Sequence, residues 1–190
     1  MDLPAAERAA QALLAALGVP VDTEATARTA ARVAAVYAEL FAPRGFTPTT
    51  FPNEHDHRDL VIARSVPFTS VCAHHLLPFV GRAHVGYLPG TRILGLSKLA
   101  RLVEMFAARP QVQEDMTEQV AGWLADRVAA AGVGVVITAG HLYMTVRGVR
   151  AHGAAAVTTA WRGVLAADRH ARMEFLTLTN GPAECGRSGR

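Results

Sequence analysis

Residues 60–88 read LVIARSVPFTSVCAHHLLPFVGRAHVGYL, and the rest of the chain is organised around this stretch. β-Branched residues are frequent over 60–71, so we expect a strand there, and we expect a second strand over 80–88, before the turn residues Pro89-Gly90. Between them, Cys72 and His75 form a Cys-x-x-His pair. A thiolate and an imidazole at this spacing can bind one metal ion, and zinc is the usual occupant. The pair alone predicts half of a metal site, which needs further ligands from elsewhere in the chain.

The residues before this stretch predict a helical arm followed by a loop. Alanine and leucine recur at helical spacing over 3–17, and a second helix, capped by Asp22 or Thr23, is expected to end at Leu40. Proline and glycine recur from there to His57, which is typical of a loop. We therefore expect an N-terminal helical arm and loop over residues 1–57, in which His55-Asp56-His57 is an ordinary polar turn rather than a metal site.

The residues after this stretch predict two helices and then two strands. Ser97 is a suitable cap for the first of these helices, and Pro110 separates it from the second. The expected elements are 98–108, 112–130, 132–146 and 154–160. The resulting order, ββααββ, predicts an α+β fold with an antiparallel four-stranded sheet over residues 58–178. Residues 179–190 are predicted to form a disordered tail.

Two features of this second half suggest a polar site. If residues 132–146 form a strand, its alternation places His141, Tyr143 and Arg147 on one face, which is either a functional site or a solvated sheet surface. Lys98 is the single lysine among 19 basic residues. A compact ammonium suits a phosphate, although one lysine can also be an accident of composition.

The overall composition excludes several classes of protein. The net charge is only +3, which gives no support for binding a nucleic-acid polymer, and no apolar run is long enough to cross a membrane. The two cysteines, Cys72 and Cys185, are far apart and form no disulfide framework. We expect a cytoplasmic protein with reduced thiols.

Taken together, the motifs resemble GTP cyclohydrolase I, a family with the tunnelling fold, from about Thr26 to Leu176. The matching motifs lie in the family's order: Arg28-Thr-Ala-Ala-Arg-Val-Ala, Cys72-Ala-His74-His75-Leu-Leu-Pro-Phe, Gly95-Leu-Ser97-Lys98-Leu-Ala-Arg101, Arg109-Pro-Gln-Val-Gln113-Glu114, His141-Leu-Tyr143-Met, Arg147-Gly-Val and Arg172-Met-Glu-Phe-Leu. The resemblance implies a hydrolase that opens the purine ring of GTP at C8 and yields 7,8-dihydroneopterin triphosphate and formate, a step of pterin and tetrahydrofolate biosynthesis.

The resemblance also implies roles for individual residues. Cys72 and His75 would bind zinc, and His74 and His141 would carry protons, because imidazole titrates near working pH. Glu114 would hold the guanine of GTP or a related purine nucleotide. The other residues implied to contact the nucleotide are Gln113 beside Glu114 and, around the triphosphate, Ser97, Lys98, Arg101 and Arg147. Homo-oligomers in the form of toroidal decamers, with sites between subunits, are implied as well.

The chain departs from the family pattern at the metal site. The third zinc ligand of the family is a cysteine at the position of Tyr143, the acidic residue between the ligands is Ala73, and a Ser/Thr-rich run is thinned at 153–159. Tyr143 could bind metal as a phenolate, which suits Fe or Mn better than zinc, and Cys185 could supply a replacement thiolate. We therefore expect weak or substoichiometric zinc.

Three functions remain open at this level. The first is an enzyme of the GTP cyclohydrolase I type with an altered metal site, acting as a specialised paralogue. The second is a non-catalytic purine or pterin nucleotide binder, or regulatory homologue, that has lost the metal. The third is a structural partner of an active homologue. Retention of Cys72, His74, His75 and His141 favours the enzyme.

Overall fold

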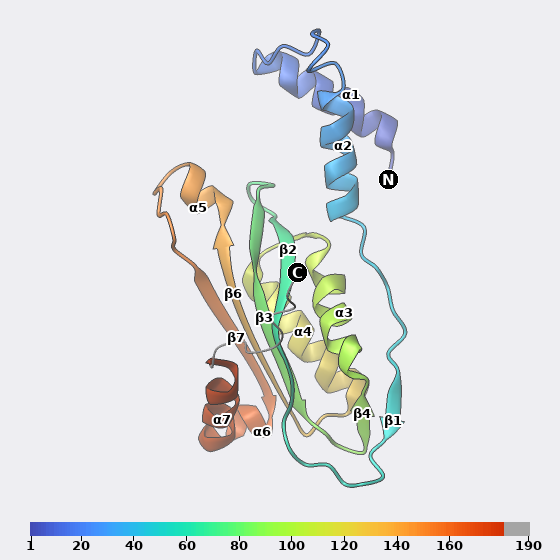
Figure 1. The fold of residues 1–190 in the computed structure, drawn as a ribbon, viewed down its shortest axis with the longest axis vertical. Helices are drawn as coiled ribbons and strands as arrows, with labels where there is room; N and C mark the ends of the chain where they lie inside the picture. The colour runs from blue at the N-terminus through green and yellow to red at the C-terminus, as the bar shows by residue number, and fades with distance from the viewer. Residues whose placement is uncertain (181–190) are drawn as a thin grey trace, which may run out of the picture. The chain divides into compact units, whose positions relative to one another are not determined.

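The computed structural model describes residues 1–180, which divide into two compact units, one of Met1–Ala42 and one that begins at Pro43 (Figure 1). The first unit holds helices α1 (Leu3–Ala16) and α2 (Thr29–Leu40). The Asp2 carboxylate caps α1 by accepting from the Ala5 N–H at 2.9 Å. The predicted second helix begins later than expected, because the chain from Thr23 forms turns before Thr29.

The second unit contains a mixed series of strands and helices. Their bounds are β1 (Thr50–Pro52), β2 (Val61–Cys72), β3 (Pro78–Leu88), β4 (Arg92–Leu94), α3 (Leu96–Ala107), β5 (Pro110–Gln111), α4 (Gln113–Val128), β6 (Gly132–His141), α5 (Leu142–Val146), β7 (Ala156–Gly163), α6 (Val164–Ala167) and α7 (Arg169–Asn180). This unit starts earlier than the expected boundary at His57, because β1 pairs with β4 and draws the preceding loop into it.

The main sheet confirms the α+β class, with five strands rather than the predicted four. Its order is β5-β2-β3-β6-β7, and the four long strands are all antiparallel. The fifth strand, β5, pairs in parallel with β2 through Val71 and Cys72 alone. Two residues that begin with a proline give no strand signal in the sequence, so this addition arises from tertiary pairing.

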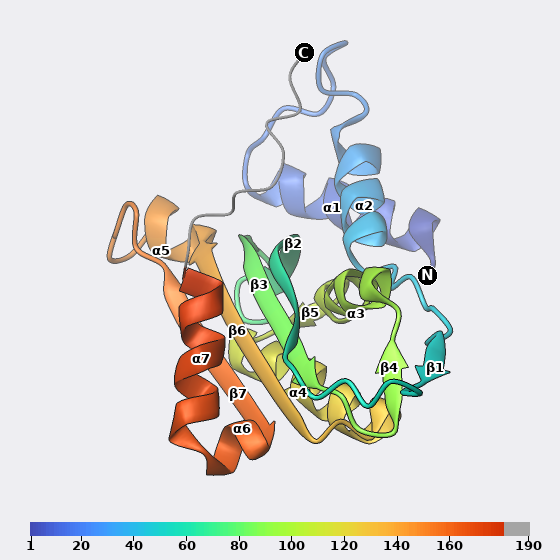
Figure 2. The same cartoon turned by 60° about the horizontal axis from the view of Figure 1, so that its bottom comes forward.

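Helices cover both faces of the sheet (Figure 2). Helices α3 and α4 pack on one face, where Phe79, Tyr87, Leu99, Leu102 and Met116 are fully buried. Helices α6 and α7, which the sequence analysis did not predict, pack on the other face around Leu165 and Phe175. The motif Arg172-Met-Glu-Phe-Leu therefore has a structural use, since Arg172 donates to the carbonyls of α6 and Phe175 enters the core.

The strand predicted over 132–146 is wrong in its last five residues, which form helix α5. On one side β6 pairs with β3 only as far as His141 opposite Phe79, and on the other side it pairs with β7 only as far as Ala139 opposite Ala156. Beyond His141 no strand of the described residues flanks the chain, so its backbone bonds within a helix instead. Tyr143 and Arg147 therefore do not share a strand face with His141.

Residues 179 and 180, predicted to belong to a disordered tail, complete α7. The remainder of that prediction, together with Cys185, lies outside the described residues. No helix within residues 1–180 is long and apolar enough to cross a membrane.

We predict that Phe175→Ala destabilises the protein by about 3–5 kcal/mol, because a large buried side chain leaves a cavity that the sheet cannot fill. The Phe175 ring packs at 90° against Trp161 and lies over two glycines, where a Cβ at Gly86 or Gly134 would come within 3.0 Å of it. Chemical denaturation measures the change. Leu178→Ala, on an exposed position of the same helix, serves as the control and should cost little. Equal losses for the two variants would contradict a core role for Phe175.

Candidate active site

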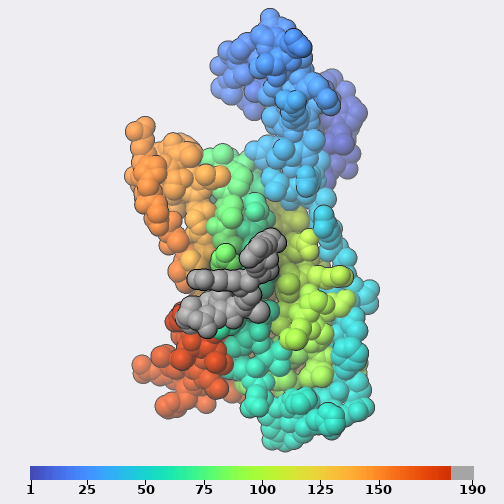
Figure 3. All heavy atoms as spheres, viewed as in Figure 1, coloured from blue at the N-terminus to red at the C-terminus, as the bar shows by residue number. Residues whose placement is uncertain are grey.

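The candidate site lies at the edge of the sheet where β2 ends, β3 begins and β6 ends. Cys72 is the last residue of β2, and Phe79 near the start of β3 pairs with His141 at the end of β6. The register of the sheet thus brings the Cys-x-x-His segment to the strand histidine. Helix α5 and the loop that follows it protrude beside this edge, in orange (Figure 3).

A tight turn fixes the Cys72–His75 pair. The Cys72 N–H donates to the Leu77 carbonyl at 2.9 Å, and the Leu76 N–H donates to the Cys72 carbonyl at 2.8 Å. Ala73 is held from the side, since its N–H donates to the carbonyl of Gln111 in β5. The turn carries Leu76 with φ of +53°, a left-handed conformation that non-glycine residues adopt rarely. His75 is therefore held over the buried Cys72 sulfur.

The donor atoms of this turn converge. Cys72 Sγ lies 3.6 Å from His75 Nδ1 and 3.9 Å from His74 Nδ1. Two ligands of one tetrahedral zinc ion, with bonds of about 2.3 Å to sulfur and 2.0–2.1 Å to nitrogen, lie about 3.6 Å apart. The Cys72–His75 pair therefore has the spacing that a shared metal requires.

A third protein ligand does not complete this pair. Tyr143, at the position where the resemblance implies one, lies with its ring stacked on His75 at 4.4 Å between centroids and 15° between planes. Residues 1–180 contain no group of three or more His, Cys, Asp and Glu side chains placed to hold a metal ion. Catalytic zinc normally has three protein ligands, so the residues that the structure describes do not fit a resident catalytic zinc.

The hydrogen bonds around Gln113 determine the proton position on His141. The Gln113 amide nitrogen faces the Ile137 and Ala156 carbonyls and the Thr158 hydroxyl at 3.1–3.2 Å, so the amide oxygen must face His141. That oxygen lies 2.8 Å from His141 Nε2 and can only accept, so Nε2 carries the proton.

His141 is consequently left with one free basic atom. Its Nδ1 is buried and has no hydrogen-bond partner among the described residues. The ring is fixed by stacking on Phe79 at 4.6 Å and 10°. Burial lowers the pKa of His141, and the charge of Glu114 acts in the opposite direction. A neutral imidazole whose Nδ1 lone pair has no hydrogen-bond partner among the described residues can accept a proton.

The predicted nucleotide-binding residues divide into two groups. Glu114 is exposed in the first turn of α4, and its charge acts to raise the pKa of His141. Gln113, in contrast, is buried, and its amide is hydrogen-bonded to the sheet. Arg147 is exposed directly after α5. These residues gather at the same edge of the sheet as Cys72.

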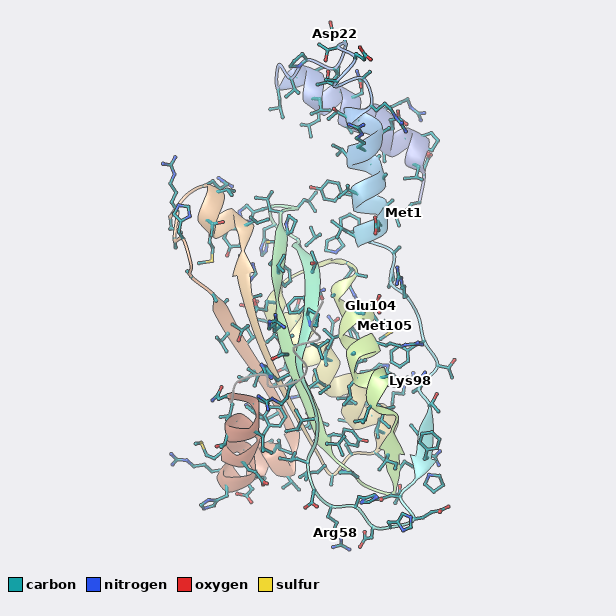
Figure 4. The ribbon with its side chains drawn as sticks, in the orientation of Figure 1. Met1, Asp22, Arg58, Lys98, Glu104 and Met105 are labelled. Carbon is teal, nitrogen blue, oxygen red and sulfur yellow. The ribbon has the colours of Figure 1, made fainter. Side chains whose placement is uncertain are left out.

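The remaining phosphate-binding candidates lie at the opposite end of α3. Ser97 and Lys98 begin that helix, whereas its last residue, Ala107, accepts a hydrogen bond from Ser70 near the Cys72 end of β2. Lys98 is about 14 Å from Ala107 along the helix at 1.5 Å per residue. Figure 4 shows Lys98 near the start of α3, with Glu104 and Met105 farther along. Within one chain, Lys98 and the Cys72 site therefore lie at opposite ends of α3. Arg101 is exposed and follows Lys98 by one turn.

Phe79 and Thr158 belong to the site, although no sequence pattern predicted a role for either residue. Phe79 closes the motif that begins at Cys72, yet only its pairing with His141 reveals that it supports the imidazole. Thr158 lies in the thinned run 153–159 and also bonds the Thr117 hydroxyl at 2.6 Å. The available signal in the sequence was that Thr158 lies within the strand expected over 154–160.

Comparison with known proteins shows the family of the chain. A sequence model of the family described as GTP cyclohydrolase I matches residues 6–180. The chain is 46% identical to GTP cyclohydrolase 1 of Thermobifida fusca over 188 residues, covering 95% of this chain and 90% of that protein. It is 43% identical to the Rhodopirellula baltica protein of the same name, covering 96% and 81%. A solved structure of the archaeosine synthase QueF-Like covers 55% of this chain and 93% of that chain with a TM-score of 0.46 and 17% identity, too low a likeness to carry an argument.

The match spans nearly the whole described chain and includes every residue of the candidate site. Identity above 40% over more than nine-tenths of the sequence is the range in which family membership is secure, and the Thermobifida fusca and Rhodopirellula baltica proteins both meet it. The chain belongs to the GTP cyclohydrolase I family.

Proposed function

We propose that the protein is a hydrolase of the GTP cyclohydrolase I type, which opens the purine ring of GTP at C8 and releases formate. The observation that carries the proposal is the convergence of Cys72, His75, His141 and Glu114 at one edge of the sheet, in a chain of this family. A protein that merely bound a nucleotide would not need both a buried basic imidazole and a thiol–imidazole pair.

The residues at this edge divide the chemistry between them. Glu114, with no ion pair among the described residues, can accept hydrogen bonds from the N1–H and amino group of guanine. His141 Nδ1 is the buried proton acceptor, and His74, exposed on the turn, exchanges protons with solvent. Gln113 acts beneath the site, where it keeps His141 in the Nε2–H form. It is thus a positioning residue rather than a contact to the guanine.

The triphosphate is held by a second copy of the chain in this proposal. Within one chain, Ser97, Lys98 and Arg101 lie toward the start of α3, whereas the last residue of that helix lies at the Cys72 edge. The outer edges of β7 and of most of β2 have no strand partner among residues 1–180, and such edges pair readily with another chain. We propose a ring of copies with the tunnelling fold, a toroidal decamer, in which Lys98 of one copy completes the site of the next.

Metal binding is proposed to be weak. Cys72 and His75 are the candidate ligands for zinc, or for iron or manganese. The described residues provide these two ligands alone, so occupancy should be low unless further ligands come from outside the chain. A cytoplasmic setting with reduced thiols keeps Cys72 available as a ligand.

Formate release from GTP by the purified full-length protein, measured with and without added metal, tests the proposal. Formate together with a pterin fluorescence product supports it. GTP binding without formate under every metal condition would favour the alternative, a nucleotide-binding homologue that has lost catalysis.

We predict that Glu114→Ala weakens GTP binding by about 2 kcal/mol or more, roughly thirtyfold in Kd, because the guanine N–H groups lose their acceptor. Calorimetric titration measures the change. Asp115→Ala, the neighbouring carboxylate in the same helical turn, is the control and should bind GTP as the parent does. An unchanged affinity for Glu114→Ala would remove the guanine-anchor role.

We predict that Lys98→Arg impairs GTP binding by about tenfold, because a planar guanidinium does not replace a compact ammonium at a tight phosphate site. The Kd is compared with that of Arg127→Lys, an exposed exchange on α4. If Lys98→Arg binds GTP as well as the parent, the single lysine is an accident of composition.

We predict that Gln113→Leu lowers the rate of formate release about tenfold or more while the Kd for GTP changes little, because His141 loses the acceptor that sets its proton position. Nitrogen-15 chemical shifts of His141 report the proton position directly. Gln119→Leu, exposed on the same helix, is the control. An unaltered His141 tautomer in Gln113→Leu would refute the positioning role.

A further inference from the structure

Tyr143 makes its contacts in the site through the faces and edges of its ring. The ring lies nearly flat against His75, and its edge meets His141 at 5.5 Å between centroids and 72° between planes. Within residues 1–180 its hydroxyl makes no hydrogen bond, ion pair or other polar contact. The Tyr143 ring thus contacts both histidines through its aromatic surface.

This stacked geometry conflicts with binding of metal by the hydroxyl. A metal bound to His75 Nδ1 lies in the imidazole plane, and the phenol oxygen lies in the plane of the tyrosine ring. Stacked rings cannot approach closer than about 3.5 Å, the contact distance of carbon atoms, and a 15° tilt is too small to close that gap. A metal–oxygen bond needs about 2.0–2.2 Å. Tyr143 therefore cannot coordinate a metal on His75 while the stack persists.

We infer that Tyr143 is a positioning residue that holds His75 by stacking, and that Cys72 and His75 form a two-ligand pair without a resident catalytic zinc. The stack connects the turn after β2 to α5 by an aromatic contact. The inference rests on the proposed function only in treating Cys72 and His75 as the metal-binding pair. The two possible roles of Tyr143 need different parts of its side chain, because stacking needs the ring and metal binding needs the hydroxyl.

Titration with Co²⁺ alone, followed by visible absorption, tests the inference. All proteins carry Cys185→Ala, so that Cys72 is the single thiol of the parent. We expect Tyr143→Phe to bind Co²⁺ with the affinity of the parent, within about threefold, and to keep its thermal unfolding temperature, because the stack remains. Tyr143→Cys should bind Co²⁺ at least about tenfold more tightly and show the intense absorption of a tetrahedral site with two thiolates.

A second set of measurements probes the stack itself. Proton NMR should show His75 ring protons shifted upfield in the parent and in Tyr143→Phe, and returned toward ordinary values in Tyr143→Leu, which keeps bulk and removes the ring current. An unshifted His75 in the parent would overturn the inference. Loss of Co²⁺ affinity in Tyr143→Phe by tenfold or more would also overturn it, as would a visible phenolate-to-iron band when Fe³⁺ is added to the parent.

These readouts are independent of turnover. If neither the parent nor any variant releases formate, the proposed function fails while the metal titrations still decide the role of Tyr143. If the parent releases formate and Tyr143→Phe has lost metal affinity, the proposed function stands and the inference about Tyr143 is wrong.

Discussion

The ladder between β3 and β6 is the constraint on which the candidate site depends. It runs without interruption from Leu88 opposite Gly132 to Phe79 opposite His141, so the position of the last pair is set by every pair before it. Antiparallel pairing ties the beginning of one strand to the end of the other, which places His141 beside the turn that follows β2. A slip of one residue would turn His141 to the opposite face of the sheet, away from Gln113 and Phe79.

Around this ladder the site is built mainly from aromatic contacts and buried hydrogen bonds. His141 is held by Phe79 on its face and by Gln113 at its edge, and the Gln113 amide is itself held by carbonyls of β6 and β7. These side chains are buried, so loss of the Gln113 amide leaves the His141 Nε2–H unpaired in the protein interior. The imidazole is thereby rigid before a substrate arrives, which reduces the cost of ordering it during a reaction.

The single chain also explains why an assembly is part of the proposal. Helix α3 carries Lys98 at one end and reaches the Cys72 edge only with Ala107 at the other. The proposed assembly would bring the cations of another copy to a nucleotide at the Cys72 edge. The outer edge of β7, which has no strand partner among residues 1–180, is where the proposal attaches another copy. The same constraint predicts that a monomer would bind the guanine without the triphosphate contacts that begin at Ser97.

Local signals in the sequence were sufficient for most of the fold. The two strands around Cys72, the helices α3 and α4, and the antiparallel α+β sheet follow from periodicity and turn residues that lie within each segment. The closeness of Cys72 and His75 was also predictable, because a single turn of chain separates the two residues.

Other features depend on partners that are distant in sequence, and only the tertiary structure determined them. Residues 142–146 leave the strand because β3 and β7 no longer flank them, and β5 exists because β2 lies beside it. The motif that contains Glu114 predicted that Gln113 contacts the nucleotide. In the structure Gln113 is buried, because the sheet supplies the acceptors for its amide. By itself the sequence determined that a tyrosine occupies position 143. The packing of α5 against the turn after β2 determined that its ring stacks on His75, because stacking depends on the relative placement of two segments that no local pattern encodes.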